Sequence, residues 1–274
     1  MSLGKLLKET MHFETSDLLV TPKVMKFLRS NTEGVLMNKA GTALSRESKA
    51  LVAEIMDKAF AGNGDRSGRF GASGRGTCHR SQLWTFLGMP TGRLQDPELT
   101  NLFNDGKYRH LRWQIMLLQS GAVTDVEVGV KFPKYRMTSS IDAVNDDEGF
   151  IVEVKGDRNP SRMMQKAGAV DEKHNLQIHS YFLLTGYDRC SYVVEDKQSQ
   201  IWREVTVVRD DAIMKDVKLE LSVLNDAVDN RQMPEMLDEC KLKQGKYKAC
   251  PFATQCYARI GNPYFPDKIG VWKS

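Results

Sequence analysis

The sequence predicts an α/β protein in which a mixed central sheet is flanked by helices. Three β-like runs follow one another in the middle of the chain, and a long helical segment separates them from two more such runs. Helical segments lie before and after this array, so the order of elements is α-β-β-β-α-β-β-α. A chain of 274 residues that is 41% hydrophobic can bury a substantial core, and we expect one domain with appendages.

Residues 1–103 are expected to form an N-terminal helical region. Between 45 and 60 the apolar side chains recur at helical intervals, and Ser45 or Ser48 can cap this helix. The apolar positions are Leu51, Val52, Ile55, Met56 and Ala59. A second helix is expected at 78–88, where the sequence reads CHRSQLWTFLG.

The segment 62–76 between these helices is expected to be a mobile loop, because it holds six glycines and three arginines. A phosphate-cradling P-loop is the alternative. No Gly-Lys-Ser or Gly-Lys-Thr follows the glycines, however, and no apolar strand precedes them. The composition therefore favours a linker that contacts DNA at most through its arginines.

Residues 104–209 are expected to hold the sheet. A helix over 104–119 stops before Gly121, a residue type that commonly ends helices. The strands are expected at 123–132, 136–145, 150–155, 190–195 and 201–208. A helix over 161–184 leads from the third strand to the fourth, and a helix over 210–228 opens the C-terminal region, 210–274.

A group of charged side chains marks the second and third strands. Alternate residues of a strand share a face, so Glu153 and Lys155 point together over an apolar floor. The turn NDDEG brings Asp142 of the preceding strand beside Glu153. Two carboxylates so close repel each other, and a divalent cation is the usual compensation, while a lysine can hold water and stabilise charge on a phosphate. A solvent-exposed hairpin with a surface ion pair is the alternative for this motif alone.

Two pairs of polar residues on the flanking helices strengthen this interpretation. His110 and Gln114 lie four apart in GKYRHLRWQ, on one face of the helix before the strands. Gln177 and Tyr181 lie four apart in QIHSY, on one face of the helix after them. Each pair alone is also typical of ordinary hydrogen-bonded, rim or core residues. Their joint occurrence around an acidic strand pair indicates a site.

In this order, the motifs GKYRH, SIDAV, VEVKG and QIHSY resemble those of the PD-(D/E)XK nucleases, specifically the RecB-type group with its restriction-endonuclease-like core. The resemblance covers roughly residues 104 to 185. It implies that Mg²⁺ or Mn²⁺ is bound by His110, Asp142 and Glu153, with the carbonyl of Val154 assisting. Lys155 would be the catalytic lysine, and Gln177 and Tyr181 would position the DNA strand and the metal shell. Gln114 occupies a position that is often Glu in such enzymes, so it receives no ligand role.

The cysteines narrow this resemblance. Five cysteines in a reducing compartment are poor disulfide candidates and are better explained as metal ligands, nucleophiles or buried thiols. One precedes the nuclease motifs and three follow them, which resembles the iron–sulfur exonucleases, including the CRISPR-associated exonuclease family and the helicase-linked AddB nucleases. The four are Cys78, Cys240, Cys250 and Cys256. The resemblance implies a 4Fe–4S cluster that staples a helical and loop region to the core, with Zn²⁺ as the alternative for four thiolates. Cys190, in the apolar run CSYVV, is expected to be a core residue.

The resemblance implies a metal-dependent DNA exonuclease that acts on single-stranded ends, 5′ to 3′, in recombination and repair, phage DNA processing or CRISPR adaptation. The alternative is a DNA-binding or assembly subunit that works through a helicase or a CRISPR adaptation protein. A third possibility is a structural protein stapled by zinc. The protein could also form a homo-oligomer. The formal charge of +4 is compatible with a polyanionic partner. No apolar run reaches about 18 residues and the N-terminus lacks a secretory signal, so we expect a cytoplasmic protein.

Overall fold

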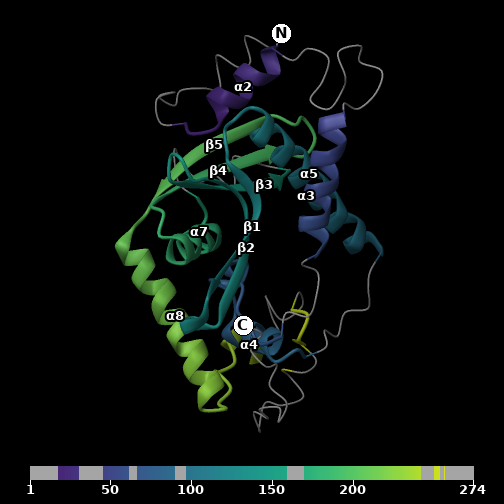
Figure 1. Cartoon of the computed structure of the whole chain (residues 1–274). Coiled ribbons are helices and arrows are strands. Elements are labelled where there is room, and N and C mark those ends of the chain that lie inside the picture. Colours follow the sequence, from purple (N-terminus) through teal and green to yellow (C-terminus); the bar gives the residue numbers. More distant parts are fainter. Residues whose placement is uncertain are drawn as a thin grey trace.

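The computed structural model describes residues 18–30, 46–61, 67–89, 97–158, 170–241, 250–253 and 256. Its centre is one five-stranded sheet in the order β1-β2-β3-β4-β5 (Figure 1). The strands are β1 (Asp125–Phe132), β2 (Met137–Asn145), β3 (Phe150–Asp157), β4 (Arg189–Asp196) and β5 (Trp202–Val208). β3 and β4 run parallel, whereas the other neighbouring strands run antiparallel. The predicted mixed sheet flanked by helices is thus confirmed.

Helices cover both faces of the sheet (Figure 1). The described helices are α2 (Thr21–Ser30), α3 (Arg46–Ala61), α4 (His79–Phe86), α5 (Pro97–Gln119), α7 (Glu172–Thr185), α8 (Asp211–Asp229) and the short α9 (Asp238–Lys241). α2, α3 and α5 share a buried apolar cluster with one face of the sheet, and α4, α7 and α8 share another with the opposite face. No helix in the described part of the chain is both long and apolar enough to span a membrane.

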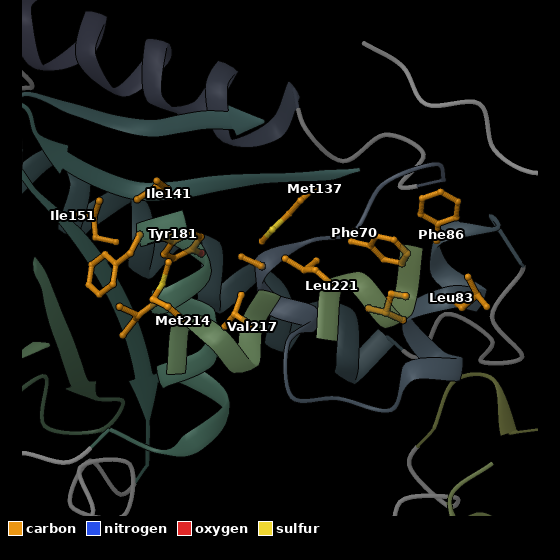
Figure 2. Close-up of a cluster of buried hydrophobic side chains, with 14 of the residues drawn as sticks. Phe70, Leu83, Phe86, Met137, Ile141, Ile151, Tyr181, Met214, Val217 and Leu221 are labelled. Atoms are coloured by element: carbon orange, nitrogen blue, oxygen red, sulfur yellow. The ribbon is translucent and has the colours of Figure 1, made fainter. Parts of the chain in front are cut away.

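Figure 2 shows part of the apolar cluster on the α7 and α8 face. Ile151 of the sheet, Tyr181 of α7 and Leu221 of α8 all belong to it, together with Phe70 and Leu83 from the first third of the chain. Leu221 is fully buried, and truncating such a leucine to alanine typically costs about 2–5 kcal/mol. The expected boundaries at 103/104 and 209/210 stay a prediction, and this cluster draws residues from all three of the regions they separate.

The segment 67–76 corrects one expectation from the sequence. In place of a mobile loop, this described part of the glycine-rich segment is packed, and 62–66 lie outside the described residues. Phe70 stacks on Phe86 with ring centroids 4.6 Å apart and pairs through its backbone with Met137. Arg75 is fully buried and hydrogen-bonded to Gln82. Burial of Phe70 and Ala72 therefore holds this part of the segment against the core despite its many glycines. The expectation of a loop relied on the glycine content and gave too little weight to these apolar residues.

Local sequence explains where the elements near the sheet begin and end. Arg136, after the 3₁₀ turn η3 (Pro133–Tyr135), has a left-handed backbone with φ of 48° and sets the hairpin between β1 and β2. Asp171 caps the start of α7, where its side chain accepts from the backbone N–H of His174, and Gly186, with φ of 82°, caps its end. Of the helix expected over 161–184, the described part is helical from Glu172 onward and non-helical at 170 and 171, and residues 161–169 lie outside the described part.

Candidate active site

Asp142 lies where the sheet is interrupted. β2 pairs with β3 through Asn145, Val144 and Ala143, and the pairing ends there. The Oδ2 atom of Asp142 then accepts a hydrogen bond from the backbone N–H of Val154 at 2.8 Å. A side-chain carboxylate thus takes the place of a backbone partner, which satisfies the Val154 N–H and fixes the carboxylate at the gap between the two strands.

Glu153 and Lys155 share the face of β3 that lies under α7, as the strand alternation predicts. The Nζ atom of Lys155 contacts Oε1 of Glu153. Glu153 is only 1% exposed, and its Oε2 atom is buried with no hydrogen-bond partner in the described structure. A buried, unpartnered carboxylate oxygen is costly, so this atom marks a position where a cation or a bound water fits.

Helix α7 supplies the residues above this pair. Gln177 donates from Nε2 to Oε1 of Glu153 at 2.8 Å and to the hydroxyl of Tyr181 at 2.7 Å. Tyr181 is 3% exposed and belongs to the apolar cluster of that face, while its hydroxyl also hydrogen-bonds Ser139. The structure therefore brings the predicted helix pair to the acidic strand pair.

Helix α5 supplies the other flank. The Nδ1 atom of His110 lies 3.3 Å from Oδ1 of Asp142. One turn further on, Gln114 donates from Nε2 to Oε1 of Glu127 at 2.7 Å and lies 3.4 Å from the carbonyl of Asp142. His110 and Gln114 therefore both reach the position of Asp142, the histidine with an imidazole nitrogen and the glutamine with an amide group.

Glu127 of β1 was not predicted to belong to the site. The register on either side, Val126 with Ala143 and Val128 with Ile141, places it opposite Asp142. Its backbone has a left-handed φ of 51°, which is uncommon for a residue other than glycine. Ligand atoms of His110, Glu127 and Asp142 all lie within 4.8 Å of one another. One carboxylate in a half-exposed strand gave no signal by itself. The observed register of the β1–β2 hairpin reveals its position, but the strand ends expected from the sequence do not give that register.

The charged groups in this cluster shift one another's pKa values. Burial acts to raise the pKa of Asp142, but His110, Lys155 and the Val154 N–H together hold it below its ordinary value. The pKa of Glu153 is raised, because burial and the Asp142 charge disfavour its ionised form more than Lys155 favours it. The carboxylate of Asp142 raises the pKa of His110 to about 9 against the effect of burial. Burial would lower the pKa of Lys155, yet the two carboxylates raise it, so this side chain is an ammonium at neutral pH.

The donor set suits a hard divalent cation. Carboxylate oxygens are the ligands that Mg²⁺ and Mn²⁺ prefer, and an imidazole nitrogen is compatible with Mn²⁺. The unpartnered Oε2 of Glu153 and the mutual repulsion of Glu153 and Asp142 are features that a cation would relieve. The residues present therefore fit the metal that the sequence resemblance implies.

Arg109 fixes helix α5 beside the ends of β3 and β4. Its Nη1 atom lies 3.4 Å from Oε1 of Glu195, a residue of β4 that also accepts from the indole N–H of Trp113 at 2.7 Å. Arg109 crosses directly over Gly156, where a Cβ atom would lie 2.5 Å from its Nε. Gly156 is therefore required next to Lys155, because its lack of a side chain lets the helix that carries His110 approach the strand.

The four cysteines predicted to bind a cofactor line one small cavity away from this cluster. Its wall consists of Cys78, Arg80, Ser81, Trp84, Met236, Leu237, Cys240, Cys250, Phe252, Ala253 and Cys256. The cavity measures about 40 Å³, which exceeds the roughly 10–15 Å³ that one water molecule needs. Arg80 donates from Nη1 to the sulfur of Cys256 at 3.6 Å. Cys190 is fully buried in β4, which confirms its expected place in the core.

Comparison with protein-family models and with curated proteins gives no match for this chain. Among solved structures, it is similar to an alkaline exonuclease (LHK-Exo) from Laribacter hongkongensis, with 18% identity, 64% of this chain and 93% of that chain covered, and a TM-score of 0.46. It is similar to SSO0001 with 15% identity, coverage of 78% and 97%, and a TM-score of 0.45. It is also similar to a phage-related exonuclease from Haemophilus somnus 129PT, with 16% identity, 73% of this chain and 92% of that chain covered, and a TM-score of 0.32.

The predicted residues thus fall into two places. His110, Asp142, Glu153, Lys155, Gln177 and Tyr181 surround the gap between β2 and β3, and Val154 borders it through its backbone. The cysteines meet at a separate cavity, whose wall includes α4 residues and segments from the end of the described chain.

Proposed function

We propose that this protein is a metal-dependent nuclease that hydrolyses phosphodiester bonds in DNA. Two buried carboxylates and an ammonium group, Asp142, Glu153 and Lys155, carry this proposal. Such a cluster costs stability, because charged groups are removed from water and like charges lie close together. A stabilising ion pair would need one carboxylate, whereas two carboxylates beside a lysine suit the binding of a cation and a phosphate together.

His110, Asp142 and Glu153 would hold Mg²⁺ or Mn²⁺, with the Val154 carbonyl assisting. When bound, such an ion acts as a Lewis acid that lowers the pKa of a bound water and neutralises charge on the phosphate. Lys155 stays protonated, so it cannot take a proton from water at neutral pH. Its ammonium instead orients the attacking water by hydrogen bonding and stabilises negative charge on the phosphate oxygens.

Gln177 and Tyr181 have positioning roles in this proposal. Gln177 holds Oε1 of Glu153, so that Oε2 points away from the helix contact and stays available. Tyr181 fixes Gln177 through its hydroxyl while its ring is anchored in the core. The motif resemblance further supports single-stranded DNA ends as the substrate, degraded 5′ to 3′, and a helicase or CRISPR adaptation protein as the partner.

We further propose that Cys78, Cys240, Cys250 and Cys256 hold a 4Fe–4S cluster, with Zn²⁺ as the alternative. Their shared cavity supports a common ligand, because the described chain brings together thiols that are up to 178 positions apart in sequence. Four thiolates carry excess negative charge, which the guanidinium of Arg80 offsets through its contact with Cys256. The group would have a structural role in this proposal, linking the start of α4 to the segment that holds Cys250 and Cys256.

A nuclease assay tests the main proposal. Purified protein is incubated with single- and double-stranded DNA labelled at the 5′ or the 3′ end, with Mg²⁺, with Mn²⁺ or with a chelator. We expect cleavage that needs the metal, prefers single-stranded ends and releases the 5′ label first. Glu153→Gln should abolish cleavage, whereas Glu148→Gln, which alters an exposed glutamate paired with Lys23, should retain it. DNA binding without any metal-dependent cleavage would instead favour a DNA-binding or assembly subunit.

A further inference from the structure

We propose that Glu127 is a ligand of the same divalent cation as His110 and Asp142. The ligand atoms of these three residues lie within 4.8 Å of one another, which is close enough for one ion to contact all three after small side-chain rotations. They come from three elements, α5, β1 and β2, that the fold brings to one point. The inference rests on the proposed nuclease function for its purpose, but the binding itself is independent of catalysis.

The carboxylate of Glu127 is held in place by two neutral donors. Gln114 donates to its Oε1 at 2.7 Å, and the hydroxyl of Ser140 donates to its Oε2 at 2.8 Å. These contacts orient the group without neutralising its charge. Glu127 lies on β1, and the register on either side puts Asp142 at the opposite position on β2, so two carboxylates meet there as well. A divalent cation compensates this second repulsion as it does the one between Asp142 and Glu153.

Gln114 provides an independent indication of a hydrated ligand at this point. Its side chain is 1% exposed, and while its Nε2 holds Glu127, its Oε1 is buried with no hydrogen-bond partner among the described residues. An amide oxygen in this state needs a donor. A water bound to the proposed cation would supply that donor. Gln114 is then a positioning residue that serves both the carboxylate ligand and the hydration shell.

The alternative is a purely structural glutamate that only joins Gln114 to Ser140. Glu127→Gln separates the two roles, because glutamine has the same shape. Its amide oxygen can still accept from Gln114, and its NH₂ can donate to Ser140, whose hydroxyl is able to accept. The substitution therefore keeps both hydrogen bonds and removes only the anionic ligand.

Mn²⁺ binding to metal-free protein, measured by calorimetry and by Mn²⁺ electron paramagnetic resonance without DNA, tests the proposal. We expect Glu127→Gln to weaken Mn²⁺ binding by more than about ten-fold, since even loss of an outer partner of a metal ligand costs that much. Glu148→Gln is the matched control for loss of one negative charge and should bind Mn²⁺ like the unaltered protein. Glu127→Asp, which keeps the charge on a shorter side chain, should fall between the two and serves if the glutamine variant does not fold.

The outcomes separate this inference from the proposed function. Unchanged Mn²⁺ affinity in folded Glu127→Gln would overturn the ligand role, even if the unaltered protein cleaves DNA. Failure of the unaltered protein to bind Mn²⁺ would overturn it too. Weakened binding in Glu127→Gln, together with no nuclease activity in the unaltered protein, would support the ligand and reject the nuclease.

Discussion

Gln177 donates a hydrogen bond from its Nε2 atom to Oε1 of Glu153 at 2.8 Å, and this bond joins helix α7 to the charged face of strand β3. The same amide group donates to the hydroxyl of Tyr181 at 2.7 Å. The orientation of the Glu153 carboxylate is therefore set by a side chain on another element, which is itself fixed by a core tyrosine.

Tyr181→Phe is expected to lower the rate of DNA cleavage about ten-fold or more, because Gln177 loses the hydroxyl that orients it. The ring stays in the apolar cluster, so the free energy of unfolding should change by only about 1 kcal/mol. Cleavage rates and thermal unfolding of the same preparation measure both effects. Tyr181→Ala is unsuitable, since truncating a buried aromatic costs about 3–5 kcal/mol. A full cleavage rate in Tyr181→Phe would show that the hydroxyl is dispensable.

Neutralising Asp142 and neutralising Glu153 should have opposite effects on the stability of the metal-free protein. Folding lowers the pKa of Asp142 and raises that of Glu153, so the fold favours the ionised form of the first and the neutral form of the second. Asp142→Asn should therefore lower the unfolding temperature and Glu153→Gln should raise it, each by about 2–4 °C per kcal/mol of change. Both variants should be inactive. Shifts in the same direction, measured by calorimetry with a chelator present, would contradict the charge distribution described here.

His110 predicts a pH dependence of stability in the metal-free protein. Its pKa rises from about 6.5 in the unfolded chain to about 9 in the fold. Because the pKa is higher in the fold, protonated His110 contributes to the free energy of unfolding. This contribution is fully present below pH 6.5 and is lost as the pH rises through about 9. Between these two pH values, the free energy of unfolding of the unaltered protein should therefore fall by up to about 3 kcal/mol more than that of His110→Gln. Chemical unfolding at several pH values measures the difference, and parallel curves for the two proteins would reject the His110–Asp142 ion pair.

Gly156→Ala is expected to destabilise the protein by about 1–3 kcal/mol, because its Cβ would overlap the buried Arg109 side chain at 2.5 Å. Displacement of Arg109 should also shift His110 and reduce cleavage. Gly129→Ala, in strand β1, is the matched control, since a Cβ there meets nothing within 4 Å. Denaturant unfolding of both variants checks the steric argument, which fails if they are equally stable.

Replacement of Cys78 by serine should remove the metal from the cysteine cavity, whereas Cys190→Ser should not. Anaerobically purified protein is expected to be brown and to contain iron and acid-labile sulfide in similar amounts. Cys78→Ser should lose both and become less stable by several kcal/mol, because the link between distant parts of the chain is lost with the ligand bonds. A content of one zinc ion per chain and no sulfide would show that the cysteines bind zinc and not an iron–sulfur cluster. Metal loss in Cys190→Ser alone would overturn the ligand assignment.

Much of the fold and of the site could be predicted because both depend on short-range patterns. Alternation in β3 fixed the shared face of Glu153 and Lys155, and helical spacing fixed that of Gln177 and Tyr181. Glu127 could not be placed this way. Its position opposite Asp142 depends on the pairing of Phe132 with Met137, whereas the expected strand ends, 132 and 136, give a register shifted by one residue. A shift by one residue changes which residue lies opposite Asp142. The observed register depends on the left-handed backbone of Arg136, which could not be predicted from the sequence.

The order in which the strands pair has a consequence for when the proposed active site is completed. β1, β2 and β3 are joined by short turns and form a local meander, whereas the parallel pairing of β3 with β4 must wait for the long connection through α7 to close. Glu127, Asp142, Glu153 and Lys155 all lie on the meander and are expected to come together early. Gln177 and Tyr181 join them only with the crossover. A newly made chain would therefore carry its acidic groups well before it could orient them, and the proposed active site would be complete only after α7 and β4 have docked.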